Sequence, residues 1–476
     1  MYQKQGLSAH FMFMDFRVET NGFQPEYFDA LFVQPSFLLL KELLPDQMET
    51  SAICMKKKAP RYAGAPAFQR ACWIGIMVCV LSMVGGCKSG QSPVAEEISP
   101  QYPDQLLQKA TNQALNNVDG FPADSLNIPR SIHPDGSLRG VKSRDWTSGF
   151  YAGTLWQLYA YSKDPKLKQA AQEWTAFQAK ERFDDHTHDL GFKVYCSIGE
   201  GYKLTAEPIY KTYIIDAARQ LIQRFNPAIG AIRSWDHNRD KWDYPVIIDN
   251  MMNLEMLFAA TRLSGDSSFY QIALQHAQKT MENHFRADHS SYHVIDFHPD
   301  GQVRKRNTHQ GHSHESAWAR GQAWGLYGFT VAYRETQVAA FLTKAQEIAQ
   351  FFFHHPRLPE DKVPYWDFDA PGIPEEERDA SAAAIAASGL LELSQHDPQN
   401  ASQYIAWADQ ILQSLGSEAY QAEQAPFLLR QSVGSKPHDS EVNVPLVYAD
   451  YFYLEALHRR KELFQRGRLQ VSTPAN

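Results

Sequence analysis

Two aspartates in short, distinctive motifs are the first candidates for chemistry. Asp189 lies in HDLGF and Asp249 lies in DNMMN, each at the expected first turn of a helix. An N-cap role alone would explain an aspartate at such a position. Two carboxyl groups at one end of a helical ring could instead work as a pair, because glycoside chemistry needs one acid to donate a proton and one carboxylate to activate water. We therefore expect Asp249 and Asp189 to be catalytic.

The expected helix ends complicate this assignment. A helix N-terminus lowers the pKa of a nearby carboxyl group, whereas a general acid needs a raised pKa. Burial or a neighbouring carboxylate would have to outweigh the helix dipole.

The segment HQGHSHESAWARGQAW (309–324) carries more polar and aromatic residues than a helix that only packs requires. Its H-x-x-H-x-H spacing is not a strong zinc pattern and no cysteine supports it, so we expect a polar pocket without a metal. Arg320 and Trp324 are four residues apart and hence share one helix face. A buried arginine requires an anionic partner, which could be a protein carboxylate or a carboxylate of the substrate.

Tryptophans form another group of candidates. The rings of Trp146 and Trp235 could stack on the C–H faces of sugars. Core packing is the more common role for any single tryptophan in a chain with 12% aromatic residues. The sequence contains no phosphate-binding loop, dinucleotide-binding fingerprint or G-x-S-x-G motif, so nothing in it supports nucleotide-dependent or serine-hydrolase chemistry.

The elements that must position these residues read as helical hairpins. Four hairpins are expected at 147–181, 250–285, 315–355 and 380–416. The first helix of each is rich in glycine, alanine and aromatic residues, and the second is more plainly amphipathic. Gly-Asp and Asp-Pro breaks separate the two, as helix stops and N-caps do.

Further helices near 103–117, 190–202, 205–226 and 445–464 bring the total to about twelve. Small-residue helices that alternate with amphipathic ones predict an all-α fold, an (α/α)6 barrel of helical hairpins. An open α-solenoid is the alternative. The long polar and aromatic loops before the inner helices favour the closed ring with a cavity at one end.

The N-terminal part has the pattern of an export signal. A basic stretch at 56–70 precedes the apolar run at 71–84, and the following VGGC resembles a bacterial lipobox. We expect cleavage before Cys87, lipid attachment to that cysteine, and export to a bacterial envelope with the lipid as the one membrane attachment. The expected parts are an upstream extension outside the translated protein (1–54), a lipoprotein signal peptide (55–86), a tether (87–100), the catalytic domain (101–466) and a C-terminal tail (467–476).

Composition excludes some partners. The chain has 476 residues and a net charge of −8, which argues against a nucleic-acid partner but not against a small anionic substrate. After maturation only Cys87 and Cys196 would remain, and the first would carry lipid. The fold must therefore stand on its own core without disulfides.

Four motifs together resemble the unsaturated glucuronyl hydrolases, a glycoside hydrolase family with an (α/α)6 barrel. They are HDLGF, DNMMNLEMLF, HQG followed by SAWARGQAWGLYG, and DASAAAIAASGLLEL. The resemblance covers roughly residues 100–465, nearly all of the expected domain. It implies activity on oligosaccharides left by polysaccharide lyases, which end in a 4,5-unsaturated uronic acid.

The resemblance also implies a mechanism and a set of site residues. One aspartate protonates C4 of the vinyl ether and helps water add at C5, after which the hemiketal opens and the glycosidic bond is lost without a cofactor. Asp249 would be this general acid/base and Asp189 its partner. The implied substrate-binding residues are His293, Gln310, Arg320 and Trp324 around the uronate, Trp146 and Trp235 as aromatic walls, and Ser432, Ser435 and Lys436 near the next sugar, where a sulfate can sit.

Two other functions stay open at this point. An unsaturated rhamnogalacturonyl hydrolase would share the barrel and the hydration chemistry but act on pectin fragments. A non-catalytic glycan-binding lipoprotein would keep the tryptophans without needing Asp249. The intact RGQAW and DNMMN segments favour the glucuronyl family, on glycosaminoglycan-type oligosaccharides.

Overall fold

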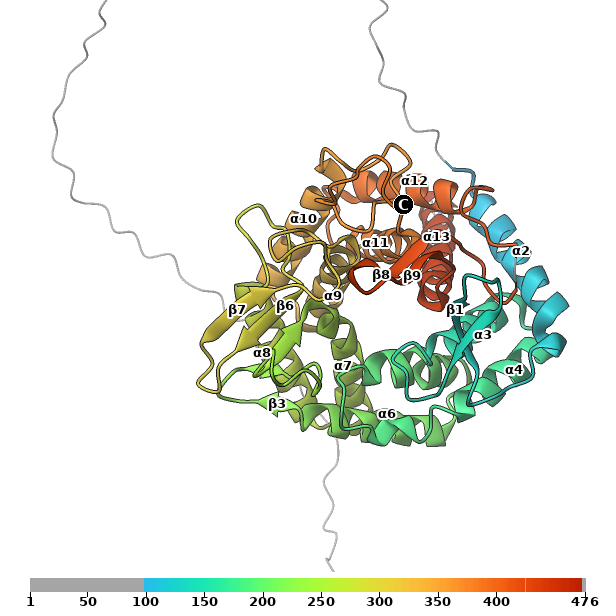
Figure 1. The fold of residues 1–476 in the computed structure, drawn as a ribbon. Coiled ribbons are helices and arrows are strands. Elements are labelled where there is room, and N and C mark those ends of the chain that lie inside the picture. The colour runs from blue at the N-terminus through green and yellow to red at the C-terminus, as the bar shows by residue number, and fades with distance from the viewer. Residues whose placement is uncertain (1–97, 424, 473–476) are drawn as a thin grey trace, which may run out of the picture. The chain divides into compact units, whose positions relative to one another are not determined.

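The computed structural model describes residues 98–423 and 425–472, and the structural statements below refer to these residues. Twelve α-helices, α2 to α13, form two concentric layers, and nine short strands lie among the connecting loops (Figure 1). The predicted signal peptide, the predicted lipidation site Cys87 and the predicted upstream extension lie outside the described residues. No helix in the described part is both long and apolar enough to cross a bilayer.

The inner layer closes on itself. Its helices are α3 (Phe150–Ser162), α5 (Glu200–Thr205), α7 (Leu254–Ser264), α9 (Ala319–Thr336), α11 (Ala380–Leu393) and α13 (Val447–Ser472). A π-helical segment η3 (Gly191–Gly199), which leads into α5, takes part in the ring. Helix α3 contacts α5 and η3, η3 contacts α7, and the contacts continue through α9, α11 and α13 back to α3.

The outer layer covers this ring with one helix for each inner helix (Figure 1). Its members are α2 (Tyr102–Asn117), α4 (Pro165–Ala176), α6 (Pro208–Ile222), α8 (Ser267–Asn283), α10 (Ala339–His354) and α12 (Ala401–Leu415). The predicted (α/α)6 barrel is therefore confirmed, and the open solenoid is excluded because α3 and α13 are in contact.

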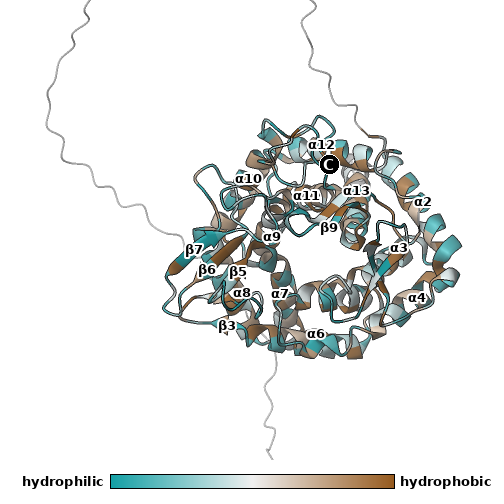
Figure 2. Cartoon of the chain, viewed as in Figure 1, coloured by the Kyte–Doolittle hydropathy of each residue, from teal (hydrophilic) through white to brown (hydrophobic). Residues whose placement is uncertain are grey.

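Small residues allow the inner helices to approach closely. Every residue of α11 is buried. A Cβ atom on Gly153 of α3 would lie 2.1 Å from the carbonyl oxygen of Cys196, and one on Gly328 of α9 would lie 2.4 Å from the Cβ of Met251. Hydrophobic residues gather between the two layers, and hydrophilic ones lie on the outer faces of α2, α4 and α6 (Figure 2).

Antiparallel strands shape the loops that precede the inner helices. They are β1 (Ile128–Ile132) with β2 (Leu138–Val141), β3 (Phe225–Asn226) with β4 (Ala231–Ile232), β6 (Val294–Phe297) between β5 (Pro245–Ile247) and β7 (Val303–Asn307), and β8 (Ser432–Ser435) with β9 (Ser440–Val444). The sequence pattern gave few strand signals because each of these strands has only two to five residues.

The predicted domain boundaries need correction at both ends. Ile98, expected in the tether, is buried, so the packed domain already includes it. Helix α13 runs to Ser472, beyond the expected end at 466 and into the expected tail. The segment expected as an ordinary helix at 190–202 is π-helical from Gly191 to Gly199, a form that often occurs at functional sites.

Asp450 of α13 is a buried carboxyl group that holds the chain before β8. It accepts a hydrogen bond from the backbone N–H of Leu429 at 2.9 Å, with a second from Leu428. Burial raises the pKa of Asp450 to about 8, and these two hydrogen bonds offset only part of that effect.

We predict that Asp450→Asn makes stability less dependent on pH. Between pH ~4, the ordinary aspartate pKa, and pH 8, the folded wild type keeps a proton that the unfolded chain releases, so its stability falls as the pH rises. The neutral asparagine can still accept the Leu429 hydrogen bond. The free energy of unfolding of the variant should therefore rise relative to that of the wild type by up to about 1.4 kcal/mol per pH unit. Thermal unfolding of both proteins from pH 5 to 8 measures this, and parallel curves would contradict it.

Candidate active site

A pocket of about 370 Å³ opens at the end of the ring where the loops precede the inner helices. Seven of the eleven predicted site residues line it: Trp146, Asp189, Trp235, Asp249, Gln310, Arg320 and Ser435. The other four, His293, Trp324, Ser432 and Lys436, are not part of the lining. The ring therefore brings together residues that are far apart in the sequence.

Asp249 stands second in a 3-10 turn, η4 (Ile248–Asn253), and does not cap a helix. It is 8% exposed, and its Oδ1 has no hydrogen-bond partner. The antiparallel pairing of β5 with β6 sets Ile247 opposite Val294, which places the adjacent His293 beside Asp249. Asp249 thus combines burial with an oxygen that is free to exchange a proton.

His293 acts on Asp249 from behind the pocket wall. Its Nδ1 accepts hydrogen bonds from the backbone N–H groups of His309 and Gln310, both at 3.1 Å. The proton of a neutral ring must therefore sit on Nε2, which lies 3.5 Å from Oδ1 of Asp249. The sequence had implied that His293 contacts the uronate, but the structure places it beside Asp249 and outside the pocket lining.

Asp189 has a different environment. Thr187 donates its hydroxyl hydrogen to Oδ2 at 2.6 Å, and Nε2 of His188 lies 3.1 Å from Oδ1. Burial raises the pKa of Asp189, but the imidazole of His188 and the hydrogen bonds from His188 and Thr187 outweigh it, so the pKa is held below its usual range. Asp189 is therefore an ionised carboxylate at neutral pH, and its side chain does not cap a helix.

Aromatic side chains form two walls of the pocket. Trp146 packs against Phe192 and Tyr448, with ring centroids 5.5 and 5.0 Å apart. Trp235 packs against Trp242 at 5.1 Å and His309 at 5.6 Å. Both predicted walls line the pocket, as the sequence indicated.

Arg320 has a protein partner. Its guanidinium is 1% exposed and lies 2.9 Å from the carboxylate of Asp379, which is fully buried. It also donates to the carbonyl oxygens of Val433 and Gly434, at 2.6 Å for the second, and so fixes β8 to the ring. The sequence left open whether Arg320 pairs with a protein carboxylate or with the substrate, and the structure shows the protein carboxylate of Asp379. Nε of Arg320 has no hydrogen-bond partner among the described residues.

Three further expectations are corrected by burial or pairing. Trp324 has no exposed surface and packs between Phe192 and Phe452 behind the wall. Ser432 is also fully buried. The ammonium group of Lys436 is bonded to two carboxylates and is not free for a sulfate. Of the predicted Ser/Lys group only Ser435 reaches the pocket.

Histidines form a further part of the lining. His188, His237, His309 and His438 all face the pocket, and the rings of His309 and His438 are 4.5 Å apart. Burial and the neighbouring histidines lower the pKa of His309 to about 3, so its ring is neutral. His188 and His309 lie within the HDLGF and HQG motifs, whereas His237 and His438 lie in loops where the sequence gave no signal beyond residue type.

Unpaired polar atoms gather at this pocket. Buried polar atoms in folded proteins nearly always have hydrogen-bond partners, so a local concentration of exceptions indicates a site for a polar ligand. The exceptions in and behind the lining are Oδ1 of Asp249, Nε2 of His293, Nε of Arg320, Nδ1 of His188, and Nε1 of Trp235 and Trp324.

The described fold and this pocket match a known enzyme family. The model of Glycosyl Hydrolase Family 88 matches residues 127–439. The chain belongs to this family. It is therefore a glycoside hydrolase, and the resemblance to unsaturated glucuronyl hydrolases is confirmed.

Individual relatives agree with the family match. The chain is 47% identical to an unsaturated glucuronyl hydrolase from Formosa agariphila over 79% of this chain and 94% of that protein. It is 34% identical to an unsaturated chondroitin disaccharide hydrolase from Streptococcus pyogenes, over 75% and 90%. The solved structure of an unsaturated glucuronyl hydrolase specific for heparin superimposes with a TM-score of 0.74 at 43% identity, covering 77% and 99%.

We predict that Arg320→Ala lowers stability as well as activity. The substitution leaves Asp379 buried without its partner, and breaking a buried ion pair costs about 3–5 kcal/mol. The melting temperature should fall markedly, whereas Lys166→Ala, which removes the exposed pair with Asp119, should change it little. A variant with unchanged melting and only a raised KM would show instead that the arginine serves the substrate.

Proposed function

We propose that this glycoside hydrolase releases the 4,5-unsaturated uronic acid from the non-reducing end of lyase-generated oligosaccharides of the glycosaminoglycan type. The observation that carries the proposal is the pair of aspartates in one pocket. Asp189 is held ionised, while Asp249 has an unpaired oxygen. The relatives are named as glucuronyl and chondroitin disaccharide hydrolases, which supports the same class of substrate.

The chemistry assigns different tasks to the two groups. Asp249 donates its proton to C4 of the vinyl ether, and the carboxylate that results takes a proton from the water that adds at C5. Asp189, whose pKa is held below its usual range, contributes an ionised carboxylate to the same pocket. The Nε2–H of His293 faces Asp249 and stabilises its carboxylate after transfer. The C5 hemiketal then opens, and the leaving sugar departs.

We predict that Asp249→Asn abolishes most of the hydrolysis, because the amide can neither donate nor take the proton. The loss in kcat should be about 10²- to 10⁴-fold. The assay follows the ultraviolet absorbance of the vinyl ether on a panel of unsaturated chondroitin and heparin disaccharides.

Asp240→Asn is the matched control, because Asp240 is an exposed aspartate in the loop between β4 and β5, shortly before Asp249. It should keep wild-type rates. Wild-type protein that consumes no disaccharide in the panel would refute the proposed activity and favour a glycan-binding protein. An Asp249→Asn variant with full activity would refute the assigned acid.

We also propose that the mature enzyme is a lipoprotein attached through Cys87. The basic stretch, apolar run and VGGC motif support this, and the tether that follows would hold the catalytic domain at a membrane surface. One lipid-modified cysteine would then be the whole anchor.

We predict that Cys87→Ser moves the enzyme from the membrane fraction to the soluble fraction of the expressing bacterium. Immunoblots of the two fractions measure this, and activity on disaccharides should follow the protein. A serine variant that stays in the membrane fraction would show that another feature holds the protein there.

A further inference from the structure

We infer that a second groove, next to the active-site pocket, binds the third and fourth sugars of an anionic oligosaccharide. This distal groove has a volume of about 410 Å³. The residues that carry the argument are Leu126, Lys142, Arg144, Lys180, Phe183 and His186. The inference rests on the proposed function, because it extends the substrate beyond a disaccharide.

The distal groove is continuous with the active-site pocket. His186 lines both. Two chain segments also run from one to the other: Arg144 lines the groove and Trp146 the pocket, and likewise Asp185 lines the groove and Thr187 the pocket. A chain of sugars that leaves the pocket past His186 therefore enters this groove.

The groove carries positive charge in a protein whose net charge is −8. Lys142, Arg144 and Lys180 are exposed, and none forms a salt bridge with another described residue. Glu181 and Asp184 also lie there, but both are paired with the buried ammonium group of Lys193. Counting Lys193, four cations stand against three carboxylates, and the exposed charges are three cations and the one carboxylate of Asp185. This excess of exposed positive charge suits a ligand with repeated carboxylate or sulfate groups.

Exposed apolar side chains complete a sugar-binding surface. Leu126 is 67% and Phe183 57% exposed, and they are two of the three large hydrophobic residues exposed in the described chain. The guanidinium of Arg182 lies 4.0 Å from the centroid of the Phe183 ring and supports it. An accessible aromatic ring beside cations is the combination that binds the apolar face and the acidic groups of a sugar together.

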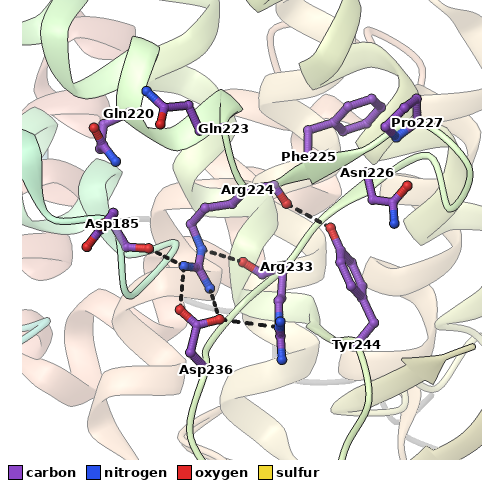
Figure 3. A pocket seen from close by; sticks show the side chains of 10 residues that line it. All are labelled: Asp185, Gln220, Gln223, Arg224, Phe225, Asn226, Pro227, Arg233, Asp236 and Tyr244. Carbon is purple, nitrogen blue, oxygen red and sulfur yellow. Dashed lines mark hydrogen bonds and ion pairs between the residues drawn. The ribbon is translucent and has the colours of Figure 1, made fainter. Parts of the chain in front are cut away.

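A third groove, shown in Figure 3, provides the contrast. There the guanidinium groups of Arg224 and Arg233 both face Asp236, at 2.9 and 3.4 Å. Arg224 also donates to the backbone oxygen of Asp185. Arg224 is thus occupied by Asp185 and Asp236, and Arg233 by Asp236. The exposed cations of the distal groove have no such ion pairs with described residues.

The test compares two substrates of different length. The substrates are an unsaturated disaccharide and the sulfated unsaturated tetrasaccharide of the same glycan, chosen from the chondroitin or heparin series that the wild type cleaves best. The test variants are Lys142→Gln/Lys180→Gln and Phe183→Ala. The control is Lys109→Gln/Lys211→Gln, which removes two exposed lysines on α2 and α6 outside the groove.

We expect a lower KM for the tetrasaccharide than for the disaccharide with wild type and control. The lysine variant should raise the tetrasaccharide KM roughly three- to tenfold and leave the disaccharide KM and kcat unchanged. Phe183→Ala should act in the same direction. Added salt should raise the tetrasaccharide KM more in wild type than in the lysine variant, since it screens exposed charges.

Two failures are distinguishable. Equal KM values for both substrates, unaffected by the groove variants, would overturn the distal site while the proposed activity stands. No cleavage of any disaccharide would overturn the proposed function itself. An equal rise in KM for both substrates in the lysine variant would also overturn the inference, because it would show a general field effect.

Discussion

The close approach of six inner helices is the constraint on which the rest of the structure depends. Where Gly153 meets the carbonyl of Cys196, backbone lies against backbone, and any side chain would force α3 away from its neighbour. The active-site pocket lies at the end of the ring, where the chain leaves each outer helix and enters the next inner one.

Inside the ring, ion pairs add to the apolar packing between the inner helices. Arg334 of α9 bonds to Glu255 of α7 and Glu392 of α11, and Arg459 of α13 bonds to the same Glu392. This network links four consecutive inner helices with nearly fixed geometry. The pocket end of the ring differs from this network, because several buried polar atoms there have no hydrogen-bond partner within the described protein.

The cations near the pocket have consequences for how an acidic sugar would be held. Arg320 is matched by Asp379, and Lys436 by two glutamates. Uncharged groups with N–H donors, among them Gln310 and the neutral ring of His309, also line the pocket. Such donors recognise a carboxylate without the large desolvation cost that a fully charged buried pair would carry. The unpaired positive charges lie outside, in the distal groove.

The sequence by itself determined the helices, the closed ring and the two aspartates. Periodicity and glycine content are local properties of the chain, and HDLGF and DNMMN are contiguous motifs. Each can therefore be recognised without knowledge of distant residues. What the tertiary structure alone decided was which groups are partners. Arg320 finds Asp379 fifty-nine residues away, and burial removes Trp324 and Ser432 from the surface that a substrate could reach. Charge pairing and burial depend on the distances between elements, and local pattern carries no information about those distances.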